Sequence, residues 1–188
     1  MKTNGSCQQV VIAGFGGQGI ILVGKLLAQS AMKAGKEVTY MPSYGAEVRG
    51  GTANCMLVID DSPISSPVID SPDTVIAMNK ASLDKFAPRV KKGGLLIINS
   101  SLIDKAPKLD DSIKIVMLPA DKIAKDLGGT KVANMVVLGA YLQKCGILKP
   151  ETACDCLPDV LAQRYHAIIP LNKKAIRKGA EFVKENGD

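Results

Sequence analysis

Residues 10–19, Val-Val-Ile-Ala-Gly-Phe-Gly-Gly-Gln-Gly, decide the fold of this chain. An apolar run opens the stretch, four glycines follow, and the apolar pattern Ile-Ile-Leu-Val-Gly-Lys-Leu-Leu continues over residues 20–27. This order predicts a strand, a tight turn and the N-terminus of a helix. Glycines let the backbone turn sharply and approach a ligand closely, while the free N–H groups that begin a helix favour negative charge. The stretch therefore predicts an α/β fold with an anion-binding turn.

The glycine spacing at Gly14, Gly16 and Gly19 matches the G-x-G-x-x-G motif of dinucleotide-binding folds. Those folds also place an acidic residue at the end of the second strand, where it holds the ribose hydroxyls. Here the second expected strand, residues 37–41, is followed by Pro-Ser-Tyr, and Glu37 stands at the strand's start. Two interpretations of the glycines therefore stay open: a nucleotide site, which the missing acid disfavours, and a tight first turn that binds nothing.

Short apolar runs alternate with helix-like segments along the first two thirds of the chain, as in a parallel sheet covered by helices. The final third is helical, over residues 132–145, 151–164 and 171–186. We expect a Rossmann-like, mostly parallel sheet flanked by helices, with an edge hairpin and a helical C-terminal segment, in one domain spanning residues 1–188. A short edge strand at residues 63–67 would form the hairpin. The expected strands are residues 8–13, 37–41, 53–59, 74–78, 95–98 and 113–118, and the other expected helices are 20–34, 81–90 and 120–127.

Composition narrows the possible partners. The chain has 188 residues, a net charge of +6 and few aromatic residues, with no Trp. Its cations are scattered, and single-stranded nucleic acid is bound by aromatic stacking surfaces, so we expect no nucleic acid partner. The five cysteines lack the spacing of a zinc or iron–sulfur site, which predicts free thiols and no metal ligand. No apolar run is long enough to cross a membrane, so we expect a cytoplasmic protein with no membrane partner.

A second glycine-rich stretch, Ser-Tyr-Gly-Ala-Glu-Val-Arg-Gly-Gly-Thr-Ala-Asn, covers residues 43–54. It follows the second strand, so in a doubly wound sheet it lies at the carboxyl edge, near the first turn. Glu47 and Arg49 could pair with each other, or Arg49 could bind a phosphate or carboxylate in a two-pronged contact. A plain surface loop is the alternative. The candidate interface residues are Ser43, Tyr44, Gly45, Glu47, Arg49, Gly50 and Gly51.

Catalytic residues are scarce. The single histidine, His166, is far along the chain from both glycine stretches, and Ser100 and Ser101 lack the strained turn of a hydrolase nucleophile. The adjacent aspartates at 60–61 and 110–111 are typical of turns. The sequence therefore predicts no complete catalytic set on this chain.

The two glycine stretches together resemble the gamma subunit of 2-oxoacid:ferredoxin oxidoreductases. Residues 14–20, Gly-Phe-Gly-Gly-Gln-Gly-Ile, and residues 43–53 carry the resemblance, and Ala-Asn-Met-Val-Val-Leu-Gly-Ala at 133–140 resembles the helix that follows the family's last strand. The likeness spans about residues 8–185. It is greatest to the 2-oxoglutarate enzyme, with the pyruvate and branched-chain ketoacid enzymes next.

The resemblance implies a subunit of an assembly. Complexes of this family oxidatively decarboxylate a 2-oxoacid, form an acyl-CoA and reduce ferredoxin. Thiamine diphosphate and Mg²⁺ are then expected on alpha and beta subunits, and iron–sulfur clusters on these or on a delta subunit, with no cofactor bound by this chain alone. Residues 43–51 would contact the partner subunits. The candidate residues for the phosphates of CoA are Gly14, Gly16, Gly17, Gln18, Gly19 and Arg49. A stand-alone nucleotide-binding oxidoreductase and a purely structural subunit remain as alternatives.

Overall fold

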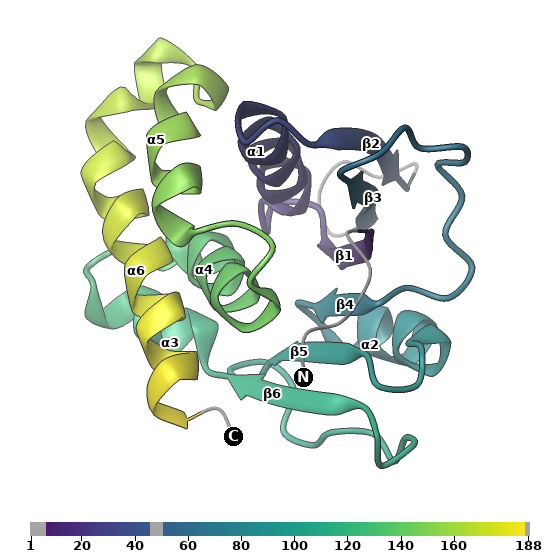
Figure 1. Cartoon of the computed structure of the whole chain (residues 1–188). Coiled ribbons are helices and arrows are strands. Elements are labelled where there is room, and N and C mark those ends of the chain that lie inside the picture. Colours follow the sequence, from purple (N-terminus) through teal and green to yellow (C-terminus); the bar gives the residue numbers. More distant parts are fainter. Residues whose placement is uncertain (1–6, 46–50, 187–188) are drawn as a thin grey trace.

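A computed structural model describes residues 7–45 and 51–186 (Figure 1). Within these ranges six strands form one sheet in the order β2-β3-β1-β4-β5-β6. The strands are β1 (Gln8–Phe15), β2 (Glu37–Tyr44), β3 (Thr52–Asp60), β4 (Thr74–Ala77), β5 (Leu95–Asn99) and β6 (Lys114–Leu118). The helices are α1 (Ile20–Lys33), α2 (Lys80–Phe86), α3 (Ala120–Asp126), α4 (Ala133–Cys145), α5 (Pro150–Val160) and α6 (Ile169–Asn186), with 3₁₀ turns η1 (Ala87–Arg89), η2 (Thr130–Val132) and η3 (Gln163–Ile168).

The sheet is mostly parallel, as the sequence predicts. β1 pairs with β4, β4 with β5 and β5 with β6 in parallel, whereas β3 runs antiparallel to both β1 and β2. β4 and β5 are buried along their whole length, which explains their mostly apolar sequences, because helices cover both faces of a parallel sheet.

The expected edge hairpin exists, but it is formed by β2 and β3. Residues 63–67, which we expected to supply its short strand, have no strand structure, so that prediction is wrong. Two prolines in this segment, Pro63 and Pro67, cannot donate to a ladder, and this explains the irregular backbone.

Three helix boundaries differ from prediction by two residues or more. α2 ends at Phe86, and the rest of the expected helix is the 3₁₀ turn η1, whose second residue is a proline. α5 ends at Val160, shortly after the internal Pro158, and of the expected continuation to residue 164 only residues 163–164 are helical, as the start of η3. α6 begins at Ile169 rather than at residue 171. The helical C-terminal segment itself is confirmed.

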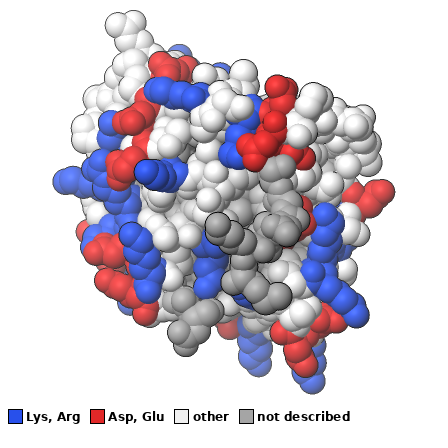
Figure 2. Space-filling model, viewed as in Figure 1, with Lys and Arg blue, Asp and Glu red and all other residues white. Residues whose placement is uncertain are grey.

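The helices form uneven layers on the sheet. Figure 1 shows α2 on one side, and α1 and α4 on the other, with α5 and α6 as an outer layer over them. Within the described ranges, none of the helices is long and apolar enough to cross a membrane. Figure 2 shows Lys and Arg atoms interspersed with Asp and Glu atoms over this face, in agreement with the scattered charges in the sequence.

A close contact between α4 and α6 connects the inner and outer helical layers. A Cβ atom added at Gly139 would lie 1.8 Å from the carbonyl oxygen of Ile176, and one added at Gly179 would lie 1.8 Å from that of Val136. Each glycine therefore lies directly against the backbone of the opposite helix. We call this pair of contacts the glycine seam.

Tyr141 of α4 is fully buried in the main core. Its hydroxyl has no hydrogen-bond partner among the described residues, and burial raises its pKa well above the usual value for tyrosine. Its neighbour one turn later, Cys145, donates its thiol to Gln8 Oε1 instead (3.2 Å).

Candidate functional site

The glycine turn joins β1 to α1. Gly17 has φ 100° and Gly19 has φ 75°, which only glycine adopts readily. Gly19 is also the N-cap of α1, and no side chain caps this end of the helix. The first N–H groups of a 14-residue helix are therefore left without a side-chain partner, at the end where the helix dipole favours anions. This geometry suits the predicted anion-binding turn.

The structure brings the two glycine-rich stretches together. The N–H of Gly16 donates to the carbonyl oxygen of Gly51 (2.8 Å). The antiparallel register of β1 and β3 explains the contact, because Phe15 at the end of β1 pairs with Thr52 at the start of β3. Tyr44 pairs with the next residue of β3, so the end of β2 lies at the same edge.

Four of the predicted interface residues can be placed at this edge. Ser43 and Tyr44 end β2, the N–H of Gly45 donates to the carbonyl oxygen of Thr52 (2.8 Å), and Gly51 contacts the glycine turn. Tyr44 is 68% exposed, an unusual position for a large aromatic side chain. The other predicted residues, Glu47, Arg49 and Gly50, lie outside the described residues. The roles of all seven residues stay predictions.

The side chain of Gln18 connects the glycine turn to the end of β4 by hydrogen bonds. Its Oε1 accepts a hydrogen bond from the N–H of Phe15 (2.7 Å), and its Nε2 donates to the carbonyl oxygen of Met78 (3.1 Å), immediately after β4. A Cβ atom at Gly14 would lie only 2.6 Å from Gln18 Oε1, so the glycine leaves room for this amide. Both ends of the Gln18 side chain are thus used within the chain, and its contact with a ligand remains a prediction.

Asn134, in the first turn of α4, supports the same turn from the other side. Its Nδ2 donates to the carbonyl oxygen of Gly19 (3.4 Å), and a Cβ atom at Gly19 would lie 2.2 Å from that nitrogen. Its Oδ1 accepts from the N–H of Met135 (2.9 Å). The start of α4 therefore contacts the start of α1, although Gly19 and Asn134 are 115 positions apart in the sequence.

A small cavity opens where these elements meet, with a volume of about 130 Å³. It lies beside the carboxyl ends of β1 and β4. After β1 the chain continues to strands on one side of the sheet, and after β4 to strands on the other side, and α/β sheets bind ligands at such a switch point. Because ligand pockets usually measure roughly 300–1,000 Å³, this cavity can hold one group of a larger molecule. Its lining residues are Gly17, Gln18, Met78, Asp121, Thr130, Lys131, Ala133 and Asn134.

Two asparagines at strand ends organise the same edge. Asn79 follows β4 and accepts the N–H of Ser82 at its Oδ1 (2.8 Å), which caps α2. Asn99 ends β5, is buried, and donates to Asp121 Oδ2 (2.6 Å) at the start of α3. Our sequence reasoning missed both residues and Asp121. A polar Asn directly after each buried apolar run was the available signal.

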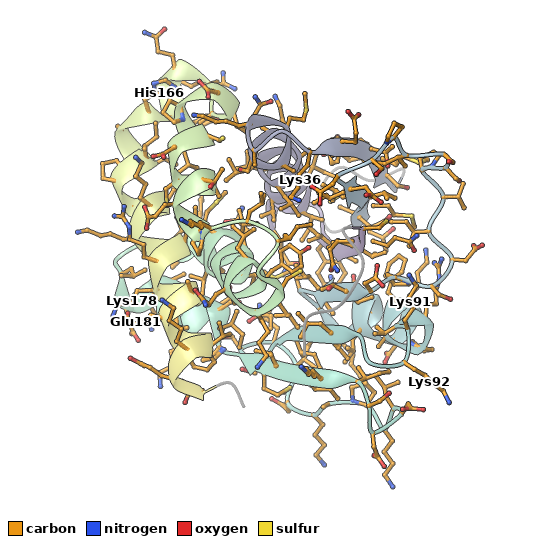
Figure 3. The ribbon with its side chains drawn as sticks, in the orientation of Figure 1. Lys36, Lys91, Lys92, His166, Lys178 and Glu181 are labelled. Atoms are coloured by element: carbon orange, nitrogen blue, oxygen red, sulfur yellow. The ribbon has the colours of Figure 1, made fainter. Side chains whose placement is uncertain are left out.

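Two buried thiols and the single histidine supply no nucleophile to this edge. Burial raises the pKa of Cys55 to about 12, and burial also raises that of Cys154 to about 11, so both thiols are protonated at neutral pH. His166, on η3, contacts the carbonyl oxygen of Leu161 (2.9 Å) and lies near the outer helices (Figure 3). In the part of the chain that the structure describes, no three His, Cys, Asp or Glu side chains are placed as metal ligands would be.

Comparison with known proteins identifies the family of this chain. Residues 9–182 match the protein family described as pyruvate ferredoxin/flavodoxin oxidoreductase. The ketoisovalerate oxidoreductase subunit VorA of Methanothermobacter marburgensis is 36% identical over 180 residues. That match covers 95% of this chain but only 37% of VorA. The 2-oxoglutarate synthase subunit KorC of Methanocaldococcus jannaschii is 32% identical, and the match covers 95% of each chain.

Two solved structures have the same fold. The gamma subunit of a keto/oxoacid ferredoxin oxidoreductase from Geobacter sulfurreducens matches 95% of this chain with a TM-score of 0.80 and 29% identity. A 2-oxoglutarate:ferredoxin oxidoreductase from Magnetococcus marinus, solved with 2-oxoglutarate, coenzyme A and succinyl-CoA bound, matches 96% of this chain and 31% of its own with a TM-score of 0.87. Its identity is 23%, so this second match concerns the fold alone.

Proposed function

The chain belongs to the pyruvate ferredoxin/flavodoxin oxidoreductase family, and from this premise we propose that it works as the gamma subunit of a 2-oxoacid:ferredoxin oxidoreductase. The complex would oxidatively decarboxylate a 2-oxoacid, form the acyl-CoA and pass the electrons to ferredoxin. The likeness to KorC, which covers 95% of each chain, supports the assignment to a gamma-type subunit. All 188 residues would act as one domain.

The observation that carries this proposal is the shared edge of the two glycine-rich stretches. The Gly16–Gly51 hydrogen bond joins them, and Tyr44 is exposed beside them. An edge built from backbone N–H groups and an exposed aromatic residue can contact another subunit without supplying catalytic groups. We assign this edge, with residues 43–51, to the contact with the alpha and beta subunits.

The same edge suits the phosphates of CoA. The start of α1 offers uncapped N–H groups and the positive end of its dipole, and Lys131 lines the adjoining cavity. The cavity has room for one group of CoA, so the rest of the molecule would lie against partner subunits. Gly16, Gly17 and Gly19 would bind phosphate through their backbone, and Arg49 would add a two-pronged contact.

The oxidation chemistry itself would belong to the partners. Thiamine diphosphate and Mg²⁺ would be held by the alpha and beta subunits, and iron–sulfur clusters by these or by a delta subunit. The substrate would be 2-oxoglutarate, as the name of KorC suggests, although VorA is named for ketoisovalerate. The partner's pocket would make that choice.

A purely structural role is the second candidate. The side-chain amides of Gln18 and Asn134 are both engaged within the chain, as expected of a turn that exists to position helices. Titration of CoA against the isolated chain and against the complex separates the two candidates, because a structural subunit changes neither the affinity nor the stoichiometry of CoA binding.

The proposed function is tested by anaerobic co-purification followed by assay. We expect the chain to purify with alpha and beta subunits, and the complex to reduce ferredoxin when given a 2-oxoacid and CoA. The isolated chain should show no turnover. Turnover by the chain alone would contradict the proposed division of labour, and purification as a free monomer under the same conditions would contradict the subunit assignment.

Arg49→Ala should raise the KM for CoA about tenfold and leave that for the 2-oxoacid unchanged, because a hydrogen-bonded charge pair contributes about 1.5 kcal/mol. Steady-state kinetics of the reconstituted complex measure both constants. Arg164→Ala is the matched control, since Arg164 lies over the ring of Tyr165 on η3. Equal CoA constants and equal assembly in both variants would remove Arg49 from the proposed site.

A further inference from the structure

The cavity at the carboxyl edge of the sheet carries two charges of opposite sign. Asp121, in the first turn of α3, and Lys131, on η2, both line this space of about 130 Å³ together with Gly17. The two side chains form no ion pair with each other, and within the described ranges neither belongs to another ion pair. Both charges therefore remain available to a ligand.

A buried asparagine orients the Asp121 carboxylate. Asn99, the last residue of β5, is 1% exposed, and its Nδ2 donates to Asp121 Oδ2 (2.6 Å). The Oδ1 of Asn99 accepts from the N–H of Ser101 (3.3 Å), so its amide is held from both ends. Asn99 therefore fixes one carboxylate oxygen, and the other, Asp121 Oδ1, can accept a hydrogen bond from a ligand in the cavity.

The two charges select different chemical groups. A carboxylate repels a phosphate and binds a hydrogen-bond donor, whereas a lysine amine attracts a phosphate. Asp121 is half-buried and Lys131 is exposed, so a donor suits the inside of the cavity and a phosphate suits its solvent-facing rim. The glycine turn is adjacent, since Gly17 and Gln18 line the same cavity.

CoA has two ends, and this cavity suits one of them. The thiol end reacts on the partner subunits under the proposed function, so the adenosine end is the one left for this chain. Adenine carries an exocyclic amine, which is a hydrogen-bond donor, and the ribose beside it carries a phosphate. A closed cavity of about 150 Å³ holds a benzene ring, so this open cavity of about 130 Å³ has room for the amine-bearing ring of adenine. Met78, which also lines it, has a thioether that contacts aromatic rings favourably.

We propose that this cavity binds the adenine of CoA, with Asp121 accepting a hydrogen bond from the exocyclic amine and Lys131 binding the neighbouring 3′-phosphate. The pyrophosphate then lies on the N–H groups at the start of α1, and the pantetheine arm extends toward the partner subunits. Asn99 is a positioning residue that acts through Asp121. The inference rests on the proposed function, because it requires a complex that uses CoA.

An analogue with the opposite hydrogen-bonding group tests the Asp121 contact. The hypoxanthine analogue of CoA has a carbonyl oxygen in place of the amine, so it presents an acceptor to the carboxylate. The unmodified complex should bind CoA about tenfold more tightly than this analogue, because a hydrogen bond to a charged group is lost. Calorimetric titration of the complex without 2-oxoacid measures both Kd values.

Asp121→Asn should remove this preference. The new amide oxygen takes over the hydrogen bond from Asn99 Nδ2, which leaves the new NH₂ group to face the ligand. That group repels the amine of adenine and donates to the carbonyl oxygen of hypoxanthine, so the variant should bind the analogue at least as tightly as CoA. Asp126→Asn is the matched control, because Asp126 is exposed in the last turn of the same helix. An equal preference for CoA in the two variants would overturn the adenine assignment.

Removal of the 3′-phosphate tests the contact with Lys131. Lys131→Ala should raise the Kd for CoA about fivefold and leave that for dephospho-CoA unchanged. Lys131 is exposed, so this variant decides between the outcomes if Asp121→Asn does not fold. An equal change in the two Kd values would overturn the proposal.

Failure of this inference is distinguishable from failure of the proposed function. An active complex whose preference for CoA does not depend on Asp121 keeps the gamma-subunit assignment and loses only the adenine site. A complex that neither binds CoA nor oxidises a 2-oxoacid would overturn both.

Discussion

Replacing Gly179 by alanine should lower the free energy of unfolding by about 3 kcal/mol, although alanine is the better helix former by about 1 kcal/mol. The added Cβ atom would lie 1.8 Å from the carbonyl oxygen of Val136, and a backbone atom cannot move aside as a flexible side chain can. α4 and α6 must therefore separate. Thermal unfolding should show a decrease in Tm of about 6–12 °C for a chain of this size.

Gly146→Ala provides the control. Gly146 ends α4 with φ 69°, and a Cβ atom there would meet nothing within 4 Å. Its replacement should therefore cost only the strain of a left-handed backbone, about 1 kcal/mol. If Gly179→Ala proves no more destabilising than Gly146→Ala, the glycine seam does not set the distance between the two helices.

Gln18→Ala should lower the free energy of unfolding by about 2 kcal/mol, because it removes one exposed and one half-buried hydrogen bond, each contributing about 1 kcal/mol. The bonds lost are those to Phe15 N and Met78 O, which join the glycine turn to the end of β4. Urea denaturation measures this change. In the assembled complex, the displaced turn should also raise the KM for CoA, because the N–H groups at the start of α1 would no longer be aligned.

The comparison variant is Gln163→Ala, since Gln163 is exposed on η3 and remote from the turn. Its unfolding free energy should change by less than about 0.5 kcal/mol. A Gln18→Ala variant as stable as Gln163→Ala would show that solvent replaces both lost bonds. A destabilised Gln18→Ala complex with an unchanged KM for CoA would favour the structural candidate over the CoA-binding one.

Much of the sheet could be predicted because its signals are local. The apolar runs of β4 and β5, and the glycines after β1, are determined by neighbouring residues. The direction of β3 could not be predicted in this way, because pairing depends on which strand edges meet in space. The strand expected at residues 63–67 is absent because Pro63 and Pro67 lack the N–H groups that strand pairing needs.

Only part of the candidate site could be predicted from the sequence. Its two glycine-rich stretches could be found, and their meeting at one edge followed from the expected sheet. Asn134 lies in the segment at 133–140 that resembles the family, but its contact with Gly19 depends on how α4 packs against α1. Gln18 was predicted as a ligand contact, yet its bonds within the chain emerge only when β4 is placed next to β1.

The burial of Tyr141 makes the rate of unfolding in alkali measurable. A phenol in that position keeps its proton in alkali that ionises an ordinary tyrosine, and the chain has no Trp to obscure the ultraviolet signal. After a jump to high pH, the late rise in tyrosinate absorbance would therefore record the exposure of Tyr141 on α4 together with that of Tyr40 on β2, whose pKa burial also raises. The same proton makes the fold less stable as the pH rises past about 10, because the unfolded chain releases it and the folded chain does not.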